Sequence, residues 1–226
     1  MTQAVPNVII DEFLGHDPDC PVFGFNLACA YPFPPAVAQF YHLFAGRLSA
    51  LDPCVYVYPE CETHVTIITF VNFSLHRRPD ASRLARLQSL REPVIEILRT
   101  VPAGPMFSLL IGKPVLTAKA AILPISDPTG EIGRIRREVI AALQANGELH
   151  RRLSAAGLNV PGIIHSTVMR FKSAPSDLKR FVADFEKIAA SVQPVEIRIE
   201  ELLLTLETKP YMREGMIDHR FPLAPV

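Results

Sequence analysis

The chain has no tryptophan and only four cysteines among its 226 residues. Cys20, Cys29, Cys54 and Cys61 all lie in the first 61 residues and form no C-x-x-C pair, which excludes zinc-finger spacing. The N-terminal residues lack the basic start and long apolar core of a secretory signal. We therefore expect reduced thiols and a cytoplasmic location.

The sequence also lacks an excess of either charge, because 23 Lys and Arg residues balance 23 Asp and Glu residues. Proteins that hold long nucleic acids through many phosphates normally carry a basic excess. The clusters at residues 134–137 and 150–152 are interrupted or flanked by glutamates, so we expect them to be solvated helix faces. No run of 18 apolar residues is present, which predicts no membrane-spanning helix.

Two nucleotide-binding patterns are absent as well. Neither G-x-x-x-x-G-K-[ST] nor G-x-G-x-x-G occurs, which argues against an ATP-driven ligase and against a dinucleotide enzyme. Proline is frequent, by contrast, with 21 residues that divide the chain into short elements.

The remaining patterns alternate between strands and helices. Asp80 is a candidate N-cap for a helix over residues 81–100, which Pro93 is expected to kink or divide. Another helical pattern starts at Asp127, runs towards Gly147 and resumes to Gly157. Further helices are predicted over residues 34–51 and 176–191, and strands over residues 21–31, 55–58, 63–73, 106–111, 115–125, 162–172, 195–208 and 217–223.

One short pattern occurs twice, about a hundred residues apart. The segment HVTIITF contains His64 and Thr66, and the segment HSTVMRF contains His165 and Thr167. On a strand, side chains two positions apart point to the same face, so each segment presents one imidazole and one hydroxyl together. Two such pairs facing one cleft would supply an acid, a base and two neutral hydrogen-bond donors, which suit metal-free phosphodiester chemistry. Each segment alone also fits an ordinary strand histidine beside a strand-favouring threonine.

Continued alternation places Phe70 and Phe171 on the same faces as the two motif threonines. Either ring could stack on a base or pack in the core. Tyr58, before the first motif, and Tyr211, in the final hairpin loop, are candidates for stacking or rim positions. Arg170 falls on the opposite face, so we expect a surface residue rather than a phosphate clamp.

The two parts of the chain share an order of strand, helix, His-x-Thr strand, helix and closing strand. We therefore expect an α+β fold in which two antiparallel sheets line a central cleft with helices outside. The whole chain, residues 1–226, would be one bilobal domain. It would comprise an N-terminal extension (1–20), a first half over about 21–104 and a second half over about 105–226, with strands able to cross over.

With both His-x-Thr segments in matching contexts, the chain resembles the 2H phosphoesterase superfamily, which includes RNA 2′,3′-cyclic phosphodiesterases and 2′-5′ RNA ligase-like proteins. The resemblance covers roughly residues 20–223 by element order. It implies a bilobal pseudo-twofold fold and a metal-independent phosphodiesterase without a cofactor. His64 and His165 would be the acid and base, in an order that sequence leaves open, and Thr66 and Thr167 would bind the phosphate.

The partner implied is a small nucleotide or an RNA terminus, without an extended nucleic-acid track or a membrane, and we expect a monomer. Two alternatives remain open at this stage. One is a non-catalytic nucleotide- or phosphate-binding protein of the same fold. The other is a metalloprotein that uses His64, His165 and Glu62, although the spacing lacks the usual paired ligands.

Overall fold

The structure, a computed structural model, describes residues 7–225, without the side chains of residues 35, 36 and 38–40. Residues 1–6 of the expected N-terminal extension lie outside the described part. The strands are β1 (Gly24–Cys29), β2 (Val55–Val57), β3 (Val65–Val71), β4 (Phe107–Ile111), β5 (Val115–Leu116), β6 (Ala120–Ser126), β7 (His165–Phe171), β8 (Val195–Ile199), β9 (Glu201–Glu207) and β10 (Met216–Pro222).

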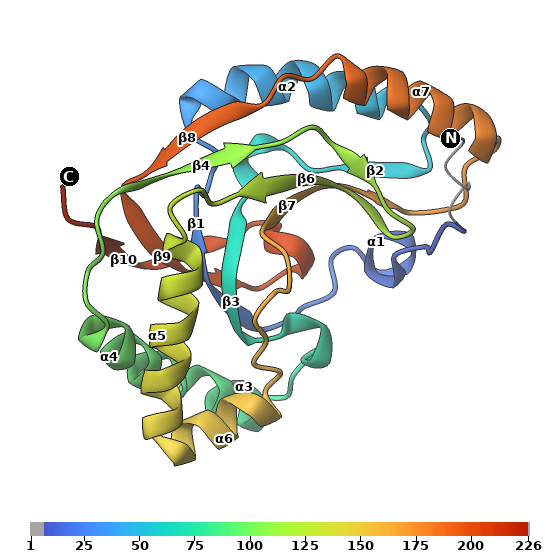
Figure 1. Ribbon diagram of the computed structural model, residues 1–226. Helices are drawn as coiled ribbons and strands as arrows, with labels where there is room; N and C mark the ends of the chain where they lie inside the picture. The colour runs from blue at the N-terminus through green and yellow to red at the C-terminus, as the bar shows by residue number, and fades with distance from the viewer. Residues whose placement is uncertain (1–6, 226) are drawn as a thin grey trace.

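These strands form two antiparallel sheets, and each sheet combines strands that are far apart in the sequence (Figure 1). The four-stranded sheet has the order β10-β9-β1-β3, and the larger sheet has the order β2-β7-β6-β4-β8 with β5 paired to β6. The two His-x-Thr segments therefore lie in different sheets, the first on β3 and the second on β7. The expected α+β class with two antiparallel sheets is confirmed.

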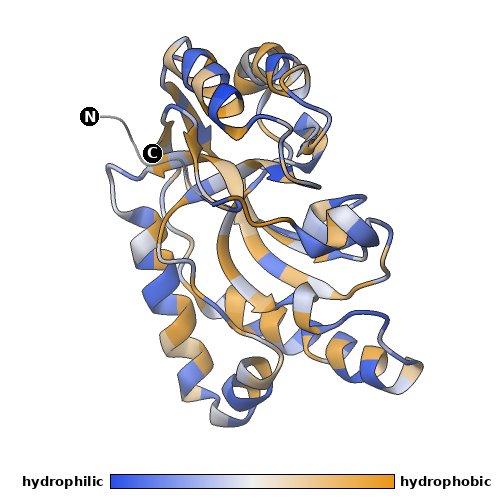
Figure 2. Ribbon diagram, turned by 90° about the vertical axis from the view of Figure 1, so that its right-hand side faces the viewer, coloured by the Kyte–Doolittle hydropathy of each residue, from blue (hydrophilic) through white to orange (hydrophobic). Residues whose placement is uncertain are grey.

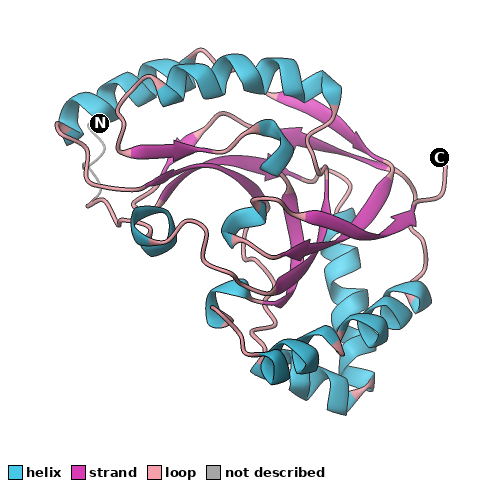
Figure 3. Ribbon diagram, turned by 180° about the vertical axis from the view of Figure 1, so that it is seen from behind, coloured by secondary structure: helices cyan, strands magenta, loops and turns pink. Residues whose placement is uncertain are grey.

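Helices cover the outer faces of both sheets. The α-helices are α1 (Glu12–His16), α2 (Pro35–Ser49), α3 (Ala81–Gln88), α4 (Arg91–Thr100), α5 (Glu131–Ala145), α6 (Gly147–Ala155) and α7 (Leu178–Ala190). Three 3₁₀ turns are η1 (Glu60–Glu62), η2 (Phe73–Leu75) and η3 (Pro210–Met212). Figure 3 shows α2 and α7 along one side of the sheets and α3 to α6 at the other.

Contacts agree with this arrangement, because α2 packs on β2 and β8, α7 on β5, and α5 and α6 on β3. In Figure 2 the central strands are mainly hydrophobic, whereas the helices carry hydrophobic and hydrophilic residues side by side. One continuous core joins the sheets and both helical layers. Within residues 7–225, every helix is too short or too polar to span a membrane. All four cysteines are free thiols, and only Cys61 is exposed.

The helix predicted after Asp80 starts as expected but is divided earlier. The Asp80 carboxylate accepts a hydrogen bond of 2.7 Å from the backbone N–H of Arg83, which is the N-cap contact. The break falls at Ser89 and Leu90, so Pro93 lies in the first turn of α4. A proline is tolerated there because its missing N–H has no partner within the helix.

The expectation of a single strand over residues 195–208 is wrong. This segment forms two strands, β8 and β9, which are separated at Glu200 and belong to different sheets. β8 pairs with β4 at the edge of the larger sheet, and β9 lies between β1 and β10 in the smaller one. This crossing places β9 in the same sheet as the first His-x-Thr strand, with β1 between the two.

Candidate active site

The strands β3 and β7 contact each other where the two sheets meet, and a cleft of about 390 Å³ lies at this junction. His64, directly before β3, and Thr66 on β3 line the cleft, together with His165 and Thr167 from β7. The structure thus brings together the four residues that the repeated pattern singled out, two from each sheet.

Each motif strand carries a β-bulge at the same place. In β3, Thr66 pairs with Ala28 and Ile68 pairs with the adjacent Leu27, so Ile67 is an extra residue. In β7, Thr167 and Met169 pair with adjacent residues of β6, so Val168 is an extra residue. An extra residue shifts the alternation of side chains by one position.

The bulges change which residues face the cleft. After the motif threonines, the next cleft-lining residues are Thr69 on β3 and Arg170 on β7, three positions further along. The expectation that Phe70 and Phe171 share the cleft face is wrong, whereas core packing, the other role considered for them, is confirmed, since both rings are fully buried. The two strands therefore share a longer pattern than His-x-Thr, with a third cleft-lining residue three positions after each motif threonine.

The expectation that Arg170 is a surface residue is also wrong, for the same reason. Its guanidinium lies in the cleft, 4.2 Å from the ring centre of Tyr211, and its Nε donates a hydrogen bond of 3.0 Å to the Tyr58 hydroxyl. Its NH1 group lies 3.5 Å from the carboxylate of Asp11. These contacts fix a positive charge beside the second motif.

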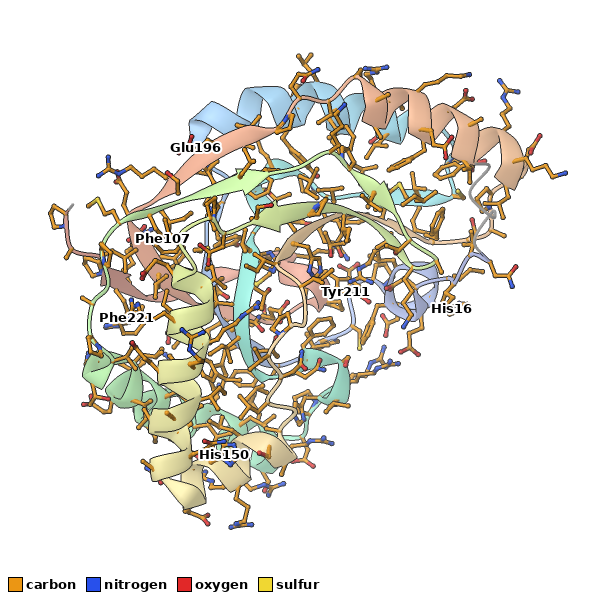
Figure 4. The ribbon with its side chains drawn as sticks, in the orientation of Figure 1. His16, Phe107, His150, Glu196, Tyr211 and Phe221 are labelled. Atoms are coloured by element: carbon orange, nitrogen blue, oxygen red, sulfur yellow. The ribbon has the colours of Figure 1, made fainter. Side chains whose placement is uncertain are left out.

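Tyr58 and Tyr211 line the cleft, as the sequence suggested, but their hydroxyls are already engaged. Tyr58 is only 2% exposed, and its hydroxyl accepts the hydrogen bond from Arg170, so its ring is not available to stack on a base. Tyr211, labelled in Figure 4, is half-buried and donates its hydroxyl hydrogen bond to Asp11. Its ring packs edge-on against Phe73, which also lines the cleft, with ring centres 5.1 Å apart.

The two imidazoles are held in the same manner. Nδ1 of His64 donates to the carbonyl oxygen of Glu62 over 2.9 Å, and Nδ1 of His165 has the same relation to Ile163 over 3.5 Å. A carbonyl oxygen only accepts, so the proton of the neutral ring is on Nδ1 and its lone pair is on Nε2. Each ring therefore keeps one nitrogen free to exchange a proton.

Burial lowers the pKa of both imidazoles. For His64, desolvation is the main cause, and the nearby His165 lowers the pKa further against the opposing backbone hydrogen bond. For His165, desolvation again comes first, and the charges of Arg170 and Arg136 also lower the pKa. Both rings thus favour the neutral form at pH 7, and the negative charge of a bound phosphate would raise their pKa values.

The cleft contains a buried carboxyl group that the sequence did not indicate. Glu207 on β9 lines the cleft, is 4% exposed, and accepts hydrogen bonds from the Asn26 side chain (3.0 Å) and the Met212 backbone (3.1 Å). Desolvation raises its pKa to about 7. The sequence around it alternates charged and apolar residues, which is typical of a half-exposed strand, so its burial depends on β9 lying between two other strands.

The segment before β1 contacts two residues that line the cleft, Arg170 and Tyr211, through Asp11. The backbone N–H of Asp11 donates a 2.8 Å hydrogen bond to Phe171 at the end of β7, and the Asp11 carboxylate caps α1. The side chain of Asp11 is only 7% exposed, and its carboxylate accepts hydrogen bonds from the Tyr211 hydroxyl and from the Arg170 guanidinium. The described part of the N-terminal extension thus contributes to the site.

The metal site considered from the sequence does not form. Glu62 belongs to η1 rather than to the strand, and its carboxylate accepts a hydrogen bond of 2.7 Å from the Tyr56 hydroxyl. Among residues 7–225, no group of three or more His, Cys, Asp or Glu side chains is arranged to hold a metal ion.

Comparison with solved structures identifies the architecture. Escherichia coli LigT in complex with 3′-AMP superposes with a TM-score of 0.54 at 12% identity, covering 90% of this chain and 99% of LigT. A structure described as a phosphoesterase gives 0.53 at 12% identity, with coverages of 90% and 99%. The chain has the LigT fold. A conserved Agrobacterium tumefaciens protein of unknown function also shares it, with a TM-score of 0.56 at 14% identity and coverages of 97% and 96%.

The fold expected from the 2H phosphoesterase resemblance is therefore confirmed. No family model matches the chain, and no curated protein sequence matches it either. Within this LigT fold, the chemistry depends on the side chains of the cleft.

Proposed function

We propose that this chain is a phosphodiesterase that hydrolyses a 2′,3′-cyclic or related phosphodiester at a nucleotide or RNA end, without a metal ion. The observation that carries this proposal is the meeting of His64 and His165, from two different sheets, in one cleft with two hydroxyls beside them. The LigT fold and its occurrence in a phosphoesterase support it.

In the proposed reaction, a water molecule attacks phosphorus on one side while the bond to a ribose oxygen breaks on the other. Nδ1 of His64 makes the shorter of the two backbone hydrogen bonds and so holds its Nε2 lone pair more firmly, and we assign His64 as the base that takes the proton from water. His165 is half-buried and less tightly held, so it can gain a proton from solvent once phosphate is bound. It then donates that proton to the leaving oxygen.

The other polar side chains of the cleft have supporting roles in this proposal. Thr66 and Thr167 donate hydrogen bonds to the non-bridging phosphate oxygens, on which charge builds in the transition state. Arg170 provides a positive charge in the site. Its planar guanidinium suits two phosphate oxygens at once.

A binding protein without activity is the second candidate, since the same cleft would hold a nucleotide phosphate. A non-catalytic site needs charge and hydrogen-bond donors but gains nothing from two imidazoles with free nitrogens. The arrangement of His64 and His165 therefore favours catalysis.

The test is to incubate the protein with 2′,3′-cyclic nucleotides and with RNA ending in a cyclic phosphate, and to identify the products by mass and regiochemistry. We expect one added water per cyclic phosphate and the same rate in the presence of EDTA. Nucleotide binding without turnover would support the binding-protein alternative. Loss of activity on chelation, restored by zinc or manganese, would contradict the metal-free mechanism.

A further inference from the structure

A second hollow, of about 310 Å³, lies between α3 and α6, on the side of the molecule away from α2 and α7. Leu87, Leu90 and two alanines, at 155 and 156, form an apolar floor. The guanidinium-bearing residues around it are Arg83, Arg86, Arg151 and Arg152. We refer to this hollow and its four arginines as the arginine pocket; His150, labelled in Figure 4, marks the position of α6.

Three of these arginines are held in place by neutral acceptors. Arg86 donates to the Ser82 hydroxyl over 2.7 Å, and Arg152 donates to the Ser89 hydroxyl over 2.9 Å. Arg83 donates to the Leu75 carbonyl oxygen over 2.8 Å and contacts Nδ1 of His76 over 2.9 Å. Among the described residues, none of the three has a carboxylate partner within 4 Å, and only Arg151 pairs with an acid, Glu148.

His76 contacts Arg83 as a neutral ring and adds no charge to the arginine pocket. It is buried, and its Nε2 lies 3.1 Å from the carbonyl oxygen of Ala156, to which it donates. Nδ1 is then an acceptor for Arg83. Desolvation lowers the His76 pKa, and the charge of Arg83 lowers it further against the backbone hydrogen bond. The neutral ring thus orients Arg83 without neutralising it.

This uncompensated charge distinguishes the arginine pocket from the expected solvated helix faces. In the cluster at residues 134–137, Arg134 pairs with both Glu131 and Glu138, and only Arg137 is exposed as expected. The expectation of a solvated face is wrong for Arg136, which is half-buried and donates a hydrogen bond of 3.0 Å to the Ile67 carbonyl oxygen of β3. Arg83, Arg86 and Arg152, which come from two helices distant in sequence, instead converge on one hollow. Fixed guanidinium groups above an apolar floor suit phosphates with a base stacked beneath them.

The arginine pocket adjoins the active-site cleft. Asn72 and Asn159 line the cleft, while His76 and Ala156 line the arginine pocket. Asn72 and His76 are four residues apart in the chain, and Ala156 and Asn159 are three apart. Even a fully extended chain of four residues spans at most about 14 Å. The two segments are also joined, because the Asn72 N–H donates a 3.0 Å hydrogen bond to the Ala156 carbonyl oxygen.

We propose that the arginine pocket binds the phosphodiester backbone of a single-stranded RNA whose terminal phosphodiester lies in the cleft. This proposal rests on the proposed function for the location of the RNA end, and it specifies the substrate as an oligonucleotide rather than a free mononucleotide. Few phosphates are involved, which agrees with the balanced charge of the chain. The proposal differs from the expectation of solvated helix faces only in that it gives α3 and α6 a binding role.

The test compares Arg86→Gln/Arg152→Gln with Lys179→Gln/Arg180→Gln, which removes two positive charges from the exposed side of α7. Binding is measured by fluorescence anisotropy with a labelled single-stranded RNA of about ten nucleotides ending in a 3′-phosphate. We expect the first variant to bind the RNA about tenfold more weakly. The slope of its log affinity against log salt should be shallower by about 1.4, because each phosphate contact of a single strand contributes about 0.7 to the slope and two are lost. The second variant should match the wild type.

A turnover measurement separates this proposal from the proposed function. The kcat/KM for a 2′,3′-cyclic mononucleotide should be unchanged in Arg86→Gln/Arg152→Gln, whereas that for an RNA with a cyclic-phosphate end should fall. Absence of turnover on both substrates would contradict the proposed function, and the anisotropy comparison would still test the arginine pocket. Equal RNA binding by the two variants, whether both weakened or neither, would overturn the arginine pocket as a binding site.

Discussion

The carboxylate of Glu207 accepts a hydrogen bond of 3.0 Å from the side-chain amide of Asn26, and both residues lie beneath the active-site cleft. Desolvation raises the Glu207 pKa to about 7, against the lowering effects of Asn26, of the Met212 N–H and of the charge of Arg170. The folded protein therefore holds a proton on this carboxyl at pH values where the unfolded chain has released it.

This difference predicts how stability depends on pH. Between the unfolded pKa of about 4.5 and the folded pKa of about 7, the folded state binds more protons, so stability decreases as pH rises. Glu207→Gln removes this dependence. The free energy of unfolding of the wild type, relative to that of the variant, should fall by about 3 kcal/mol between pH 4.5 and pH 8. Urea unfolding at the two pH values measures it, with exposed Glu186→Gln as the control, which should track the wild type.

Removal of either imidazole should abolish most turnover. His64→Ala and His165→Ala should each lower kcat by about 10²–10⁴-fold, because each removes one proton-transfer group from the cleft. His42→Ala, on the exposed face of α2, is the matched control and should retain full activity. Circular dichroism would show whether the folds are intact. Near wild-type turnover in either cleft variant would require the acid–base assignment to be withdrawn.

The pH dependence of the rate should reflect the lowered pKa values of the two histidines. The base must be neutral, so the acidic limb of kcat/KM should fall below pH 6.5, the ordinary histidine value. Because the rings interact, the limbs belong to the pair rather than to one residue. In kcat, the basic limb should lie at higher pH, since bound phosphate favours the protonated acid. An acidic limb above pH 6.5 would contradict a desolvated base.

Arg170→Lys tests whether the planar guanidinium matters in addition to its charge. Lysine keeps the positive charge but cannot contact Tyr58 and two phosphate oxygens together, so we expect kcat/KM to fall by about 10²-fold. Arg77→Lys is a close control, because Arg77 also pairs with a carboxylate and lies 4.2 Å over an aromatic ring, that of Phe13, outside the cleft lining. Similar losses in both variants would indicate a structural role for Arg170.

The sequence predicted the meeting of the two motifs because strand alternation acts over two positions, and both His-x-Thr pairs precede their bulges. It could not predict Arg170, since an extra residue after each motif threonine leaves no mark in the hydrophobic pattern. The burial of Glu207 depends on β9 pairing with β1 and β10, which are distant in sequence. The arginine pocket likewise forms only when α3 and α6 come together.

The described N-terminal residues should influence catalysis through Asp11. Asp11→Asn preserves the cap of α1, because asparagine is also a good N-cap, but it removes the charge that faces Arg170 and alters the contact with Tyr211. We expect kcat/KM to fall by about tenfold as Arg170 loses its orientation, with little change in melting temperature. Asp177→Asn, at the exposed N-cap of α7, is the matched control and should leave activity unchanged.

A double-mutant cycle decides whether Asp11 acts through Arg170. If it does, Asp11→Asn should cost much less in kcat/KM when introduced into Arg170→Lys than into the wild type, because the orientation it provides is already lost. Effects that simply add would mean that Asp11 influences the cleft by another route, through Tyr211 or the packing of α1. The same cycle with Tyr211→Phe, which removes only the hydroxyl bonded to Asp11, separates these two routes.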